Sequence, residues 1–478
     1  MTGGLRDRSR YSLAGVSALA VLAMGTPVDA QDNQAIQAQI KALQSQINSL
    51  QRQVEQANVA AAAAQKSSGD DLDLKVKWRG APEFSSADGN FKMKLRGRLH
   101  ADWNSINQDE SITGRPNVDA FEIRRARLGI EGVVWGDVKY IVEADFANDA
   151  VSLKDAYLEY TGLFEDFGLR FGNFKTFNSF DQLNSSNYRT FQETPSFVEA
   201  DTIDRQIGAA ALYTKKHYTL AAGIFGPTTA TEERWLDDIR TGSARITLAP
   251  INEEGKVIHA GASWRSRKGA TDLRAGPINT ATNQFFQYRA RGADLHLADR
   301  FISTPAVFDE DTFWGLEGLL IYKWLHVVGE YTQLKADVSP FFSTTSPDPN
   351  YDGWYIETGF WLTGETTTYN EGVYGRPKVK NPVFNGGYGA WQLVGRYDVL
   401  DLTDKALGIP NTAGFIPGGT LLGEQKTWLV GVNWWLNNHT RFQFQYSESD
   451  IGGGFLNGAN INDGAKIKGF GARAQVDW

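Results

Sequence analysis

The stretch Phe91–Trp103, FKMKLRGRLHADW, alternates between two kinds of side chain along its whole length. One parity is apolar or small: Phe91, Met93, Leu95, Gly97, Leu99, Ala101 and Trp103. The other is polar: Lys92, Lys94, Arg96, Arg98, His100 and Asp102. Strict alternation is the period of a β-strand, whose successive side chains point to opposite faces. A membrane-spanning strand needs about 9–11 residues, against about 5–6 for an average soluble strand. The stretch therefore predicts a transmembrane strand with lipid on one face and a basic, water-filled lumen on the other.

The same alternation recurs from residue 88 to residue 478, where helical periodicity is absent. Strands are expected around residues 91–103, 125–134, 138–146, 155–160, 169–172, 205–214, 217–225, 241–249, 256–265, 311–322, 325–336, 352–362, 391–397, 428–436, 442–446 and 470–478. Sixteen is an even number, as single-chain bacterial barrels have. The predicted fold over residues 88–478 is therefore an all-β transmembrane barrel of 16 antiparallel strands.

The connections between these strands mostly alternate in length, as the long outer loops and short periplasmic turns of such barrels do. The long ones are 104–118, 174–204, 226–240, 266–310 and 401–424, and the short ones are 136–137, 215–216, 250–255, 323–324 and 437–439. Two connections depart from the rule. Residues 147–150 are short on the outer side, and residues 363–388 are long on the periplasmic side.

The N-terminal residues 1–30 have the features of a secretory signal peptide. Arg6, Arg8 and Arg10 precede the apolar run Leu13–Met24, which is too short to span a bilayer, and Val28–Ala30 provides a small residue at the expected cleavage point. The protein is therefore predicted to be exported and to reside in the bacterial outer membrane.

Residues 31–66 follow a heptad pattern that predicts a short coiled coil. Its apolar seam, at spacings of four and three residues, is Ile36, Ile40, Leu43, Ile47, Leu50 and Val54. Such a seam implies self-association, and Ile or Val at a with Leu at d favours two strands in parallel coils. The alternative is a lone amphipathic helix packed on its own domain. Residues 67–87 are interpreted as a linker leading into the barrel.

The composition argues against several classes of function. The 478 residues include no cysteine, which excludes disulfides and thiolate metal sites, and the formal net charge of −8 disfavours a nucleic-acid partner. The six histidines are scattered, and no nucleophile elbow or catalytic triad is present. Asp348–Gly353 resembles the start of a calcium loop but lacks its bidentate glutamate. No enzyme activity, metal or cofactor is expected.

Basic side chains recur on the parity opposite the apolar one. They are Lys92, Lys94, Arg96, Arg98, Arg125, Arg127, Lys139, Arg245, Arg265, Arg396, Arg441 and Arg473. Pores lined by arginine and lysine favour anions, and the arginine fork matches phosphate oxygens. The same lumenal parity also carries Glu131, Glu143, Asp145, Asp155, Glu159 and Asp477. The pattern predicts an anion-preferring lumen; the alternative is a lumen with charges of both signs that only keep it hydrated.

Several segments in order resemble one family. They are Glu122–Gly132, Glu143–Phe146, Lys154–Tyr160, Arg170–Lys175, Phe360–Glu365, Gly389–Leu402, Gly431–Tyr446 and Arg473–Trp478. Over roughly residues 88–478 the chain is similar to the phosphate-selective porins O and P. The resemblance implies a homotrimeric outer-membrane barrel of 16 strands, with the third loop folded into the pore. It also implies passive uptake of phosphate or related anions along lumenal arginines and lysines.

The expected constriction loop is Phe174–Phe197, with Lys175, Asp181, Arg189 and Glu193 as its charged residues. It departs from the family pattern, because the arginine of the motif Phe-Met-Glu-Arg is replaced by Thr194. The predicted function is passive diffusion of small anions, including phosphate or polyphosphate. The alternatives are a porin for carboxylates or sugars, and a barrel that anchors a coiled-coil tether between the outer membrane and the cell wall.

Overall fold

The computed structural model describes most of the chain, and the described residues form two units that meet in sequence at Asp73 and Leu74. They are residues 30–67, 74–78, 80–226, 228–229, 241–269, 285–340, 348–404, 422–456, 459–460 and 462–478. Apart from Ala30, the predicted signal peptide lies outside the described residues.

The first unit contains the helix α1 (Ala30–Ser67), where a helical coiled coil was predicted. Five residues of the predicted seam are between 49% and 59% exposed: Ile40, Leu43, Ile47, Leu50 and Val54. The helix is therefore confirmed, and its pairing with other copies stays a prediction. None of the described helices combines the length and the apolar character needed to span a bilayer.

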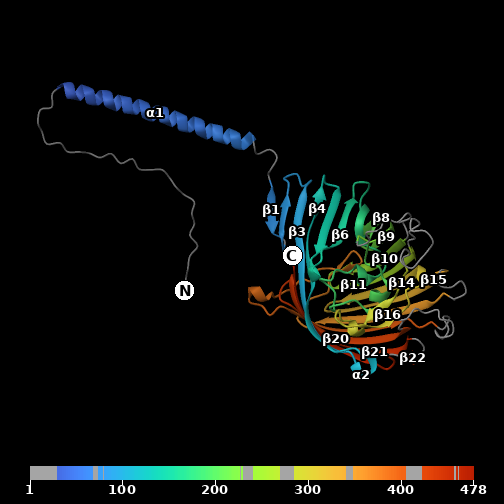
Figure 1. Ribbon diagram of the computed structural model, residues 1–478. Coiled ribbons are helices and arrows are strands. Elements are labelled where there is room, and N and C mark those ends of the chain that lie inside the picture. Colours follow the sequence, from blue (N-terminus) through green and yellow to red (C-terminus); the bar gives the residue numbers. More distant parts are fainter. Residues whose placement is uncertain are drawn as a thin grey trace. The chain divides into compact units, whose positions relative to one another are not determined.

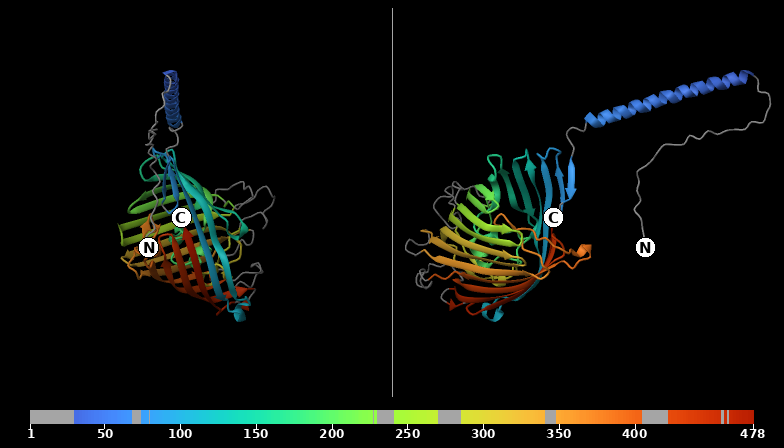
Figure 2. Two further views of the ribbon diagram at one scale, coloured as in Figure 1. Left: turned by 90° about the vertical axis from the view of Figure 1, so that its left-hand side faces the viewer. Right: turned by 180° about the vertical axis from the view of Figure 1, so that it is seen from behind.

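The second unit is a closed barrel of sixteen antiparallel strands (Figures 1 and 2). The strands are β3 (Lys92–Asn107), β4 (Val118–Val134), β5 (Val138–Asp145), β6 (Ser152–Tyr160), β7 (Phe167–Lys175), β8 (Arg205–Lys215), β9 (Tyr218–Phe225), β10 (Thr241–Glu253), β11 (Lys256–Lys268), β14 (Phe308–Tyr322), β15 (Leu325–Val338), β16 (Asn350–Trp361), β19 (Ala390–Asp401), β20 (Leu422–Trp435), β21 (Thr440–Leu456) and β23 (Lys466–Asp477). Strand β23 pairs with β3 and closes the barrel. All sixteen predicted strands are confirmed.

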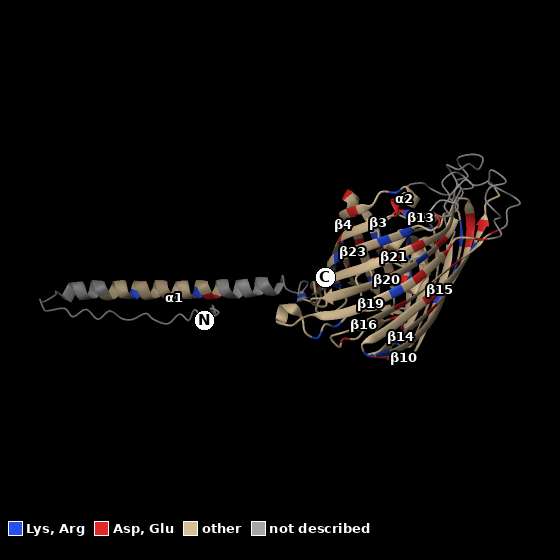
Figure 3. Cartoon of the chain, turned by 90° about the horizontal axis from the view of Figure 1, so that it is seen from below, with Lys and Arg blue, Asp and Glu red and all other residues tan. Residues whose placement is uncertain are grey.

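The alternation on β3 separates its two faces as the sequence predicts. Arg98, His100 and Asp102 are buried inside the barrel, whereas Leu95 and Leu99 are exposed on its outer wall. Charged residues of both signs occur along the strands (Figure 3). Eight connections lie at the end of the barrel with long loops, and seven lie at the end with short turns. The first end is extracellular and the second periplasmic in bacterial outer-membrane barrels.

A hairpin precedes the barrel within the segment interpreted as a linker. Its strands are β1 (Lys75–Trp78) and β2 (Pro82–Ser85), and β2 pairs with residues 92–94 of β3. Strand β23 pairs with residues 98–107 of the same β3 edge. One edge of β3 is thus shared by two strands. Strands of four residues are too short to give a clear alternation, so the sequence did not indicate them.

Three segments enter the lumen, the third only in part, since its residues Phe384 and Tyr388 are 69% and 56% exposed. The first, residues 176–204, contains α3 (Phe180–Leu183) and α4 (Ser196–Asp201). The second, residues 285–307, contains β12 (Arg289–Arg291), η3 (Gly292–Asp294) and β13 (Arg300–Ser303). The third, residues 362–389, contains β17 (Tyr369–Asn370), β18 (Val373–Tyr374) and η4 (Val383–Asn385). Smaller elements lie between other strands: α2 (Glu110–Thr113), η1 (Ala147–Asp149) and β22 (Ala459–Asn460).

The third segment explains why one periplasmic connection is long. The Tyr374 backbone N–H donates to the Asn184 side-chain oxygen at 2.8 Å, and the rings of Tyr374 and Phe180 lie 5.0 Å apart. Residues 362–389 therefore support the segment 176–204 from the periplasmic side. Buried aromatic residues of the first two segments join one apolar cluster with the wall, including Phe180, Phe197, Phe301, Phe308 and Tyr351. This cluster fills the lumen beside β14 to β16.

Barrel closure depends on a glycine at the seam between β3 and β23. The backbones of Gly97 and Trp478 exchange hydrogen bonds of 3.2 and 3.1 Å, and the Trp478 indole covers Gly97. A Cβ atom at Gly97 would lie 2.2 Å from the Trp478 ring. The seam therefore accepts no larger side chain at this position.

We expect Gly97→Val to impair barrel assembly, because overpacking of a close contact costs about 1–3 kcal/mol. The measurement is the fraction of heat-modifiable, folded barrel on unboiled SDS gels. Gly318→Val is the matched control, since a Cβ atom there has no contact closer than 3.9 Å. Equal folded fractions for both variants would contradict the role given to Gly97.

Candidate functional site

A cavity of about 560 Å³ lies between strands β3 to β8 and the first two lumenal segments. The charged side chains that line it are Arg96, Arg98, Arg124, Arg125, Arg127, Asp145, Lys154, Asp155, Arg170, Lys175, Arg189, Glu193, Glu199, Asp204, Arg205, Arg291 and Asp294, and His296 lies beside them. Eleven of these are basic and six are acidic. The apolar cluster beside β14 to β16 lies on the other side of the lumen, so this cavity is bordered by the charged wall of β3 to β8 and by the loops.

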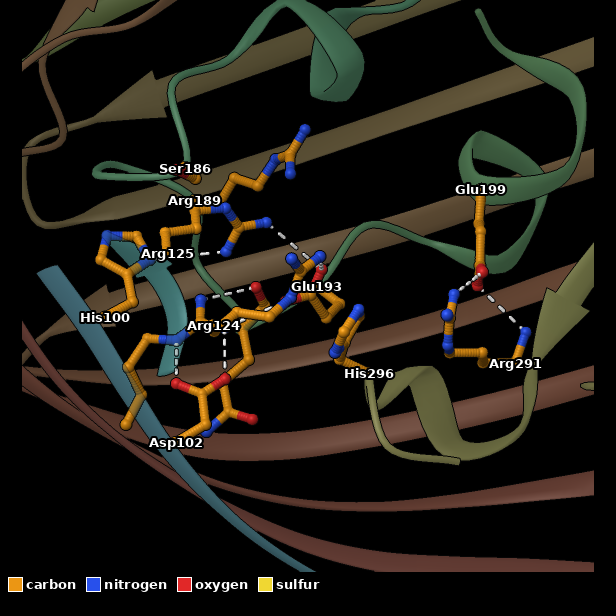
Figure 4. Close-up of polar contacts among 12 residues, drawn as sticks. His100, Asp102, Arg124, Arg125, Ser186, Arg189, Glu193, Glu199, Arg291 and His296 are labelled. Carbon is orange, nitrogen blue, oxygen red and sulfur yellow. Dashed lines mark hydrogen bonds and ion pairs between the residues drawn. The ribbon is translucent and has the colours of Figure 1, made fainter. Parts of the chain in front are cut away.

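A β-bulge places two adjacent arginines on the cavity side of β4. In the pairing of β3 with β4, His100 faces Arg125 and Ala101 faces Ile123, which leaves Arg124 as the extra residue. A bulge lets two residues of one strand oppose one residue of its partner. Arg124 and Arg125 consequently both reach Glu193 (Figure 4). Strict alternation assigns Arg124 to the lipid face, so the sequence analysis missed it.

The structure divides the predicted lumenal bases into three groups. Arg96, Arg98, Arg125 and Arg127 line the cavity. A second group is buried and donates to backbone carbonyls of the lumenal segments: Arg245, Arg265, Arg396, Arg441 and Arg473. The third group does not line the cavity and lies at the short-turn ends of β3 and β5. It consists of Lys92, Lys94 and Lys139. The first group faces the open space of the cavity, whereas the second contacts the loops.

Carboxylates of the wall neutralise part of this positive charge. Glu143 lies 3.2 Å from Arg96, 3.3 Å from Arg98 and 3.3 Å from Arg127. Asp155 lies 2.9 Å from Arg205. Glu131 and Asp145 pair with Arg96 and Arg127, Glu159 pairs with Arg170 and Lys139, and Asp477 pairs with Arg376. The predicted acidic residues are therefore counter-ions, and an excess of basic residues remains around the cavity.

Three of the four predicted charged residues of the constriction loop line the cavity, namely Lys175, Arg189 and Glu193, and Asp181 is bound to one of them. The Lys175 ammonium donates to the carbonyls of Gln182 and Asn184 at 2.6 and 3.0 Å. Asp181 and Arg189 form an ion pair of 3.2 Å. Glu193 accepts from Arg124 at 2.8 Å and from Arg473 at 3.0 Å. Although burial disfavours its charged form, the surrounding arginines hold the pKa of Glu193 well below its ordinary value.

Further residues of the site come from positions that the sequence analysis did not single out. They are Arg124, Lys154, Arg170, Arg205 and Arg291. Lys154, Arg170 and Arg205 lie in or at the ends of predicted strands, so a wider search of the lumenal parity would have found them. Arg291 and His296 belong to a loop without periodicity, and His296 pairs with Glu122 at 2.7 Å. Within the described ranges, no group of three or more His, Cys, Asp or Glu residues could hold a metal ion.

One wall residue, Glu330 on β15, fixes the start of α3. Its carboxylate accepts hydrogen bonds from the Ser179 hydroxyl at 3.1 Å and from the backbone N–H groups of Phe180 and Asp181, both at 2.9 Å. The Tyr355 hydroxyl donates to the same carboxylate at 3.0 Å. Four donors on one carboxylate position the loop firmly against β15.

We expect Glu330→Gln to loosen the constriction loop, because an amide offers one acceptor atom and leaves buried donors unpaired, at about 1–3 kcal/mol. Single-channel recordings should show a larger or more variable conductance than wild type. Glu253→Gln, at an exposed position on β10, is the control. Identical conductance in folded Glu330→Gln and wild-type barrels would contradict this anchoring role.

Comparisons with known proteins agree with this geometry. The family model described as phosphate-selective porin O and P matches residues 93–478. Porin O of Pseudomonas aeruginosa is 28% identical over 418 residues, covering 82% of this chain and 92% of that protein. An uncharacterised protein of Caulobacter vibrioides is 29% identical over 431 residues, covering 88% of this chain and 80% of that protein.

Solved structures of outer-membrane channels are similar at lower identity. An anion-selective porin from Comamonas acidovorans has a TM-score of 0.49 at 11% identity, covering 81% of this chain and all of that one. The outer-membrane channel DcaP of Acinetobacter baumannii has a TM-score of 0.46 at 13% identity, covering 83% and 99%. The family model spans most of the sequence, including the strands of the barrel. The chain therefore belongs to the phosphate-selective porin O and P family of outer-membrane porins.

Proposed function

We propose that this outer-membrane porin carries small anions by passive diffusion through the cavity beside β3 to β8. The observation that carries the proposal is the lining of that cavity, with eleven Lys or Arg residues against six Asp or Glu residues. Fixed positive charge along a narrow aqueous path lowers the energy of an anion and raises that of a cation. An anion preference follows from this imbalance.

The ligand chemistry favours oxyanions. Arginines outnumber lysines in the cavity, and a guanidinium presents two parallel N–H groups to two oxygens of a carboxylate or phosphate. The contact between Arg124 and Glu193 is an example of this geometry, because the Arg124 guanidinium donates to both carboxylate oxygens, at 2.8 and 2.9 Å. Phosphate or polyphosphate fits such donors, and so does a small carboxylate. A neutral sugar gains nothing from the excess charge.

The two loop glutamates moderate the expected selectivity. Glu193 and Glu199 both come from the segment 176–204 and both line the cavity. Each carboxylate occupies guanidinium groups that would otherwise be free for a permeating anion. We therefore propose a general anion preference with weaker phosphate binding than a fully basic constriction would give.

The function is tested by the reversal potential in a planar bilayer across a potassium chloride gradient. Wild-type porin should show anion preference, and a cation preference would contradict the proposal. Lys154→Gln should lower the chloride-to-potassium permeability ratio about two- to fivefold. This range follows because one unit charge 4 Å from an ion contributes about 1 kcal/mol in water.

Lys92→Gln is the matched control for this measurement. Both lysines lie on strands of the same wall, and neither forms an ion pair among the described residues. Lys154 lines the cavity, whereas Lys92 does not. Equal effects of the two substitutions would show that overall charge, rather than the lining of this cavity, sets the ion preference.

We also propose that α1 joins copies of the chain through its apolar seam. The seam residues Ile40, Leu43, Ile47, Leu50 and Val54 are exposed, and such a stripe is the contact surface of a coiled coil. The assembly that the family resemblance implies is a homotrimer. Ile or Val at a with Leu at d favours two strands in isolated parallel coils, so a trimer would require the barrels to set the number of copies.

Replacing Leu43 and Leu50 together by aspartate should weaken the oligomer, because it places charges in the seam of every copy. The molar mass of the full chain in detergent, measured by light scattering at rising temperature, reports the assembly. Aspartate at Ser45 and Asn48, off the seam, adds the same charge as a control. Unchanged dissociation of the Leu43/Leu50 variant would exclude α1 from the assembly, and contact with the cell wall would become its better explanation.

A further inference from the structure

Two glutamates of the segment 176–204, Glu193 and Glu199, bind arginines inside the barrel, and they are held differently (Figure 4). Glu193 is bound by Arg124, Arg125 and Arg473, and the Arg473 side chain is fully buried. Among the described residues, the ion-pair partners of Glu199 are Arg291 and Arg300, and the side chains of Glu199, Arg291 and Arg300 are 23%, 21% and 32% exposed. Partly exposed ion pairs are weak, whereas buried pairs are costly to break. Glu199 is thus the loosely held carboxylate.

Glu199 stands between two cavities. Beside the main cavity lies a second one of about 280 Å³, lined by residues 199–202, Arg267, residues 285–287, Arg289 and Arg300. Glu199 and Thr202 line both cavities. Arg267 lies at the end of β11 next to the long loops, so the smaller cavity is on the extracellular side. An anion that moves from the smaller cavity to the larger one meets the Glu199 carboxylate.

The donors around Glu199 form a site for two oxygens. The Arg291 backbone N–H donates to Oε2 at 3.0 Å, the Arg300 guanidinium donates to Oε1 at 2.9 Å, and the Arg291 guanidinium also binds Oε1. The Nε atom of Arg300 is buried without a hydrogen-bond partner. Arg289, which lines the outer cavity, forms no ion pair among the described residues. The site therefore has more donor capacity than Glu199 uses.

We propose that Glu199 is a tethered counter-ion that controls the passage of oxyanions between the two cavities. Its carboxylate occupies the donors of Arg291 and Arg300 that a permeating phosphate or carboxylate would bind, and the anion passes by displacing it. Glu199 is accordingly a specificity-determining residue: it lowers the affinity of this step and prevents an anion from remaining bound. The inference rests on the proposed anion transport and assigns one of its steps to a named carboxylate.

The test uses the full-length porin in planar bilayers, with chloride carrying the current and inorganic phosphate added on the long-loop side. Glu199→Gln frees the charges of Arg291 and Arg300, so the phosphate concentration that halves the chloride current should fall at least about fivefold. Glu199→Asp keeps the charge and should stay closer to wild type. Glu110→Gln, on the exposed α2 at the same end of the barrel, should leave the block unchanged.

Arg300→Gln provides a second, independent variant, read only for barrels that are heat-modifiable on gels. In the wild-type background it should raise the half-blocking concentration, and in the Glu199→Gln background it should cancel the gain. The first of these outcomes applies even if Glu199→Gln does not assemble, because Arg300→Gln alone leaves the carboxylate in place.

The result separates this inference from the function on which it rests. A cation-selective wild-type channel overturns anion transport and the role of Glu199 with it. An anion-selective wild type whose phosphate block is unaltered by both Glu199→Gln and Arg300→Gln overturns the tethered counter-ion alone. If Glu110→Gln strengthened the phosphate block as much as Glu199→Gln does, the tethered counter-ion would also be overturned. Surface charge would then explain the stronger block.

Discussion

Buried guanidinium groups that bind loop carbonyls determine the shape of this pore. The wall donates to the segment 176–204 through four arginines on four strands, at N···O distances of 2.6, 3.2, 2.7 and 2.7 Å: Arg265, Arg396, Arg441 and Arg473. A buried charge is stable only when it is paired and hydrogen-bonded. Without the loop these groups would lose acceptors, and without them the loop carbonyls would be unpaired. The loop and the wall therefore stabilise each other inside the barrel.

This anchoring places the open path off the barrel axis. The segments 176–204 and 285–307 pack their aromatic residues against β14 to β16, and the segment 362–389 contacts the first of them from the periplasmic side. Space remains next to β3 to β8, where the strands contribute closely spaced arginines. The proposed permeation path therefore has a charged wall on one side and two anchored loops on the other. If anions follow it, the glutamates of those loops face them as well as the bases of the wall.

The alternation of polar and apolar residues was sufficient to predict every strand of the barrel wall, because lipid and lumen impose opposite polarity on successive side chains. It also predicted correctly that residues such as Arg98 and Arg473 face inward. The alternation could not predict which inward arginines line the cavity and which are bound by the loops. That depends on the positions of loop carbonyls such as those of Arg189 and Gln192, which accept from Arg441 and Arg473. Arg291 could not be predicted as a cavity residue either, because a loop has no periodicity from which the direction of a side chain can be inferred.

The bulge on β4 has a consequence for the density of charge along the path. In a regular strand, side chains on one face are separated by two residues, or about 6.6–6.8 Å. Arg124 and Arg125 face the same cavity although their Cα atoms are adjacent, about 3.8 Å apart. Backbone geometry, and not only composition, therefore concentrates guanidinium groups at one level of the barrel, where both bind Glu193. A strand with the same number of arginines and no bulge would spread these groups over a longer distance, and one carboxylate could not bridge two neighbours of the chain.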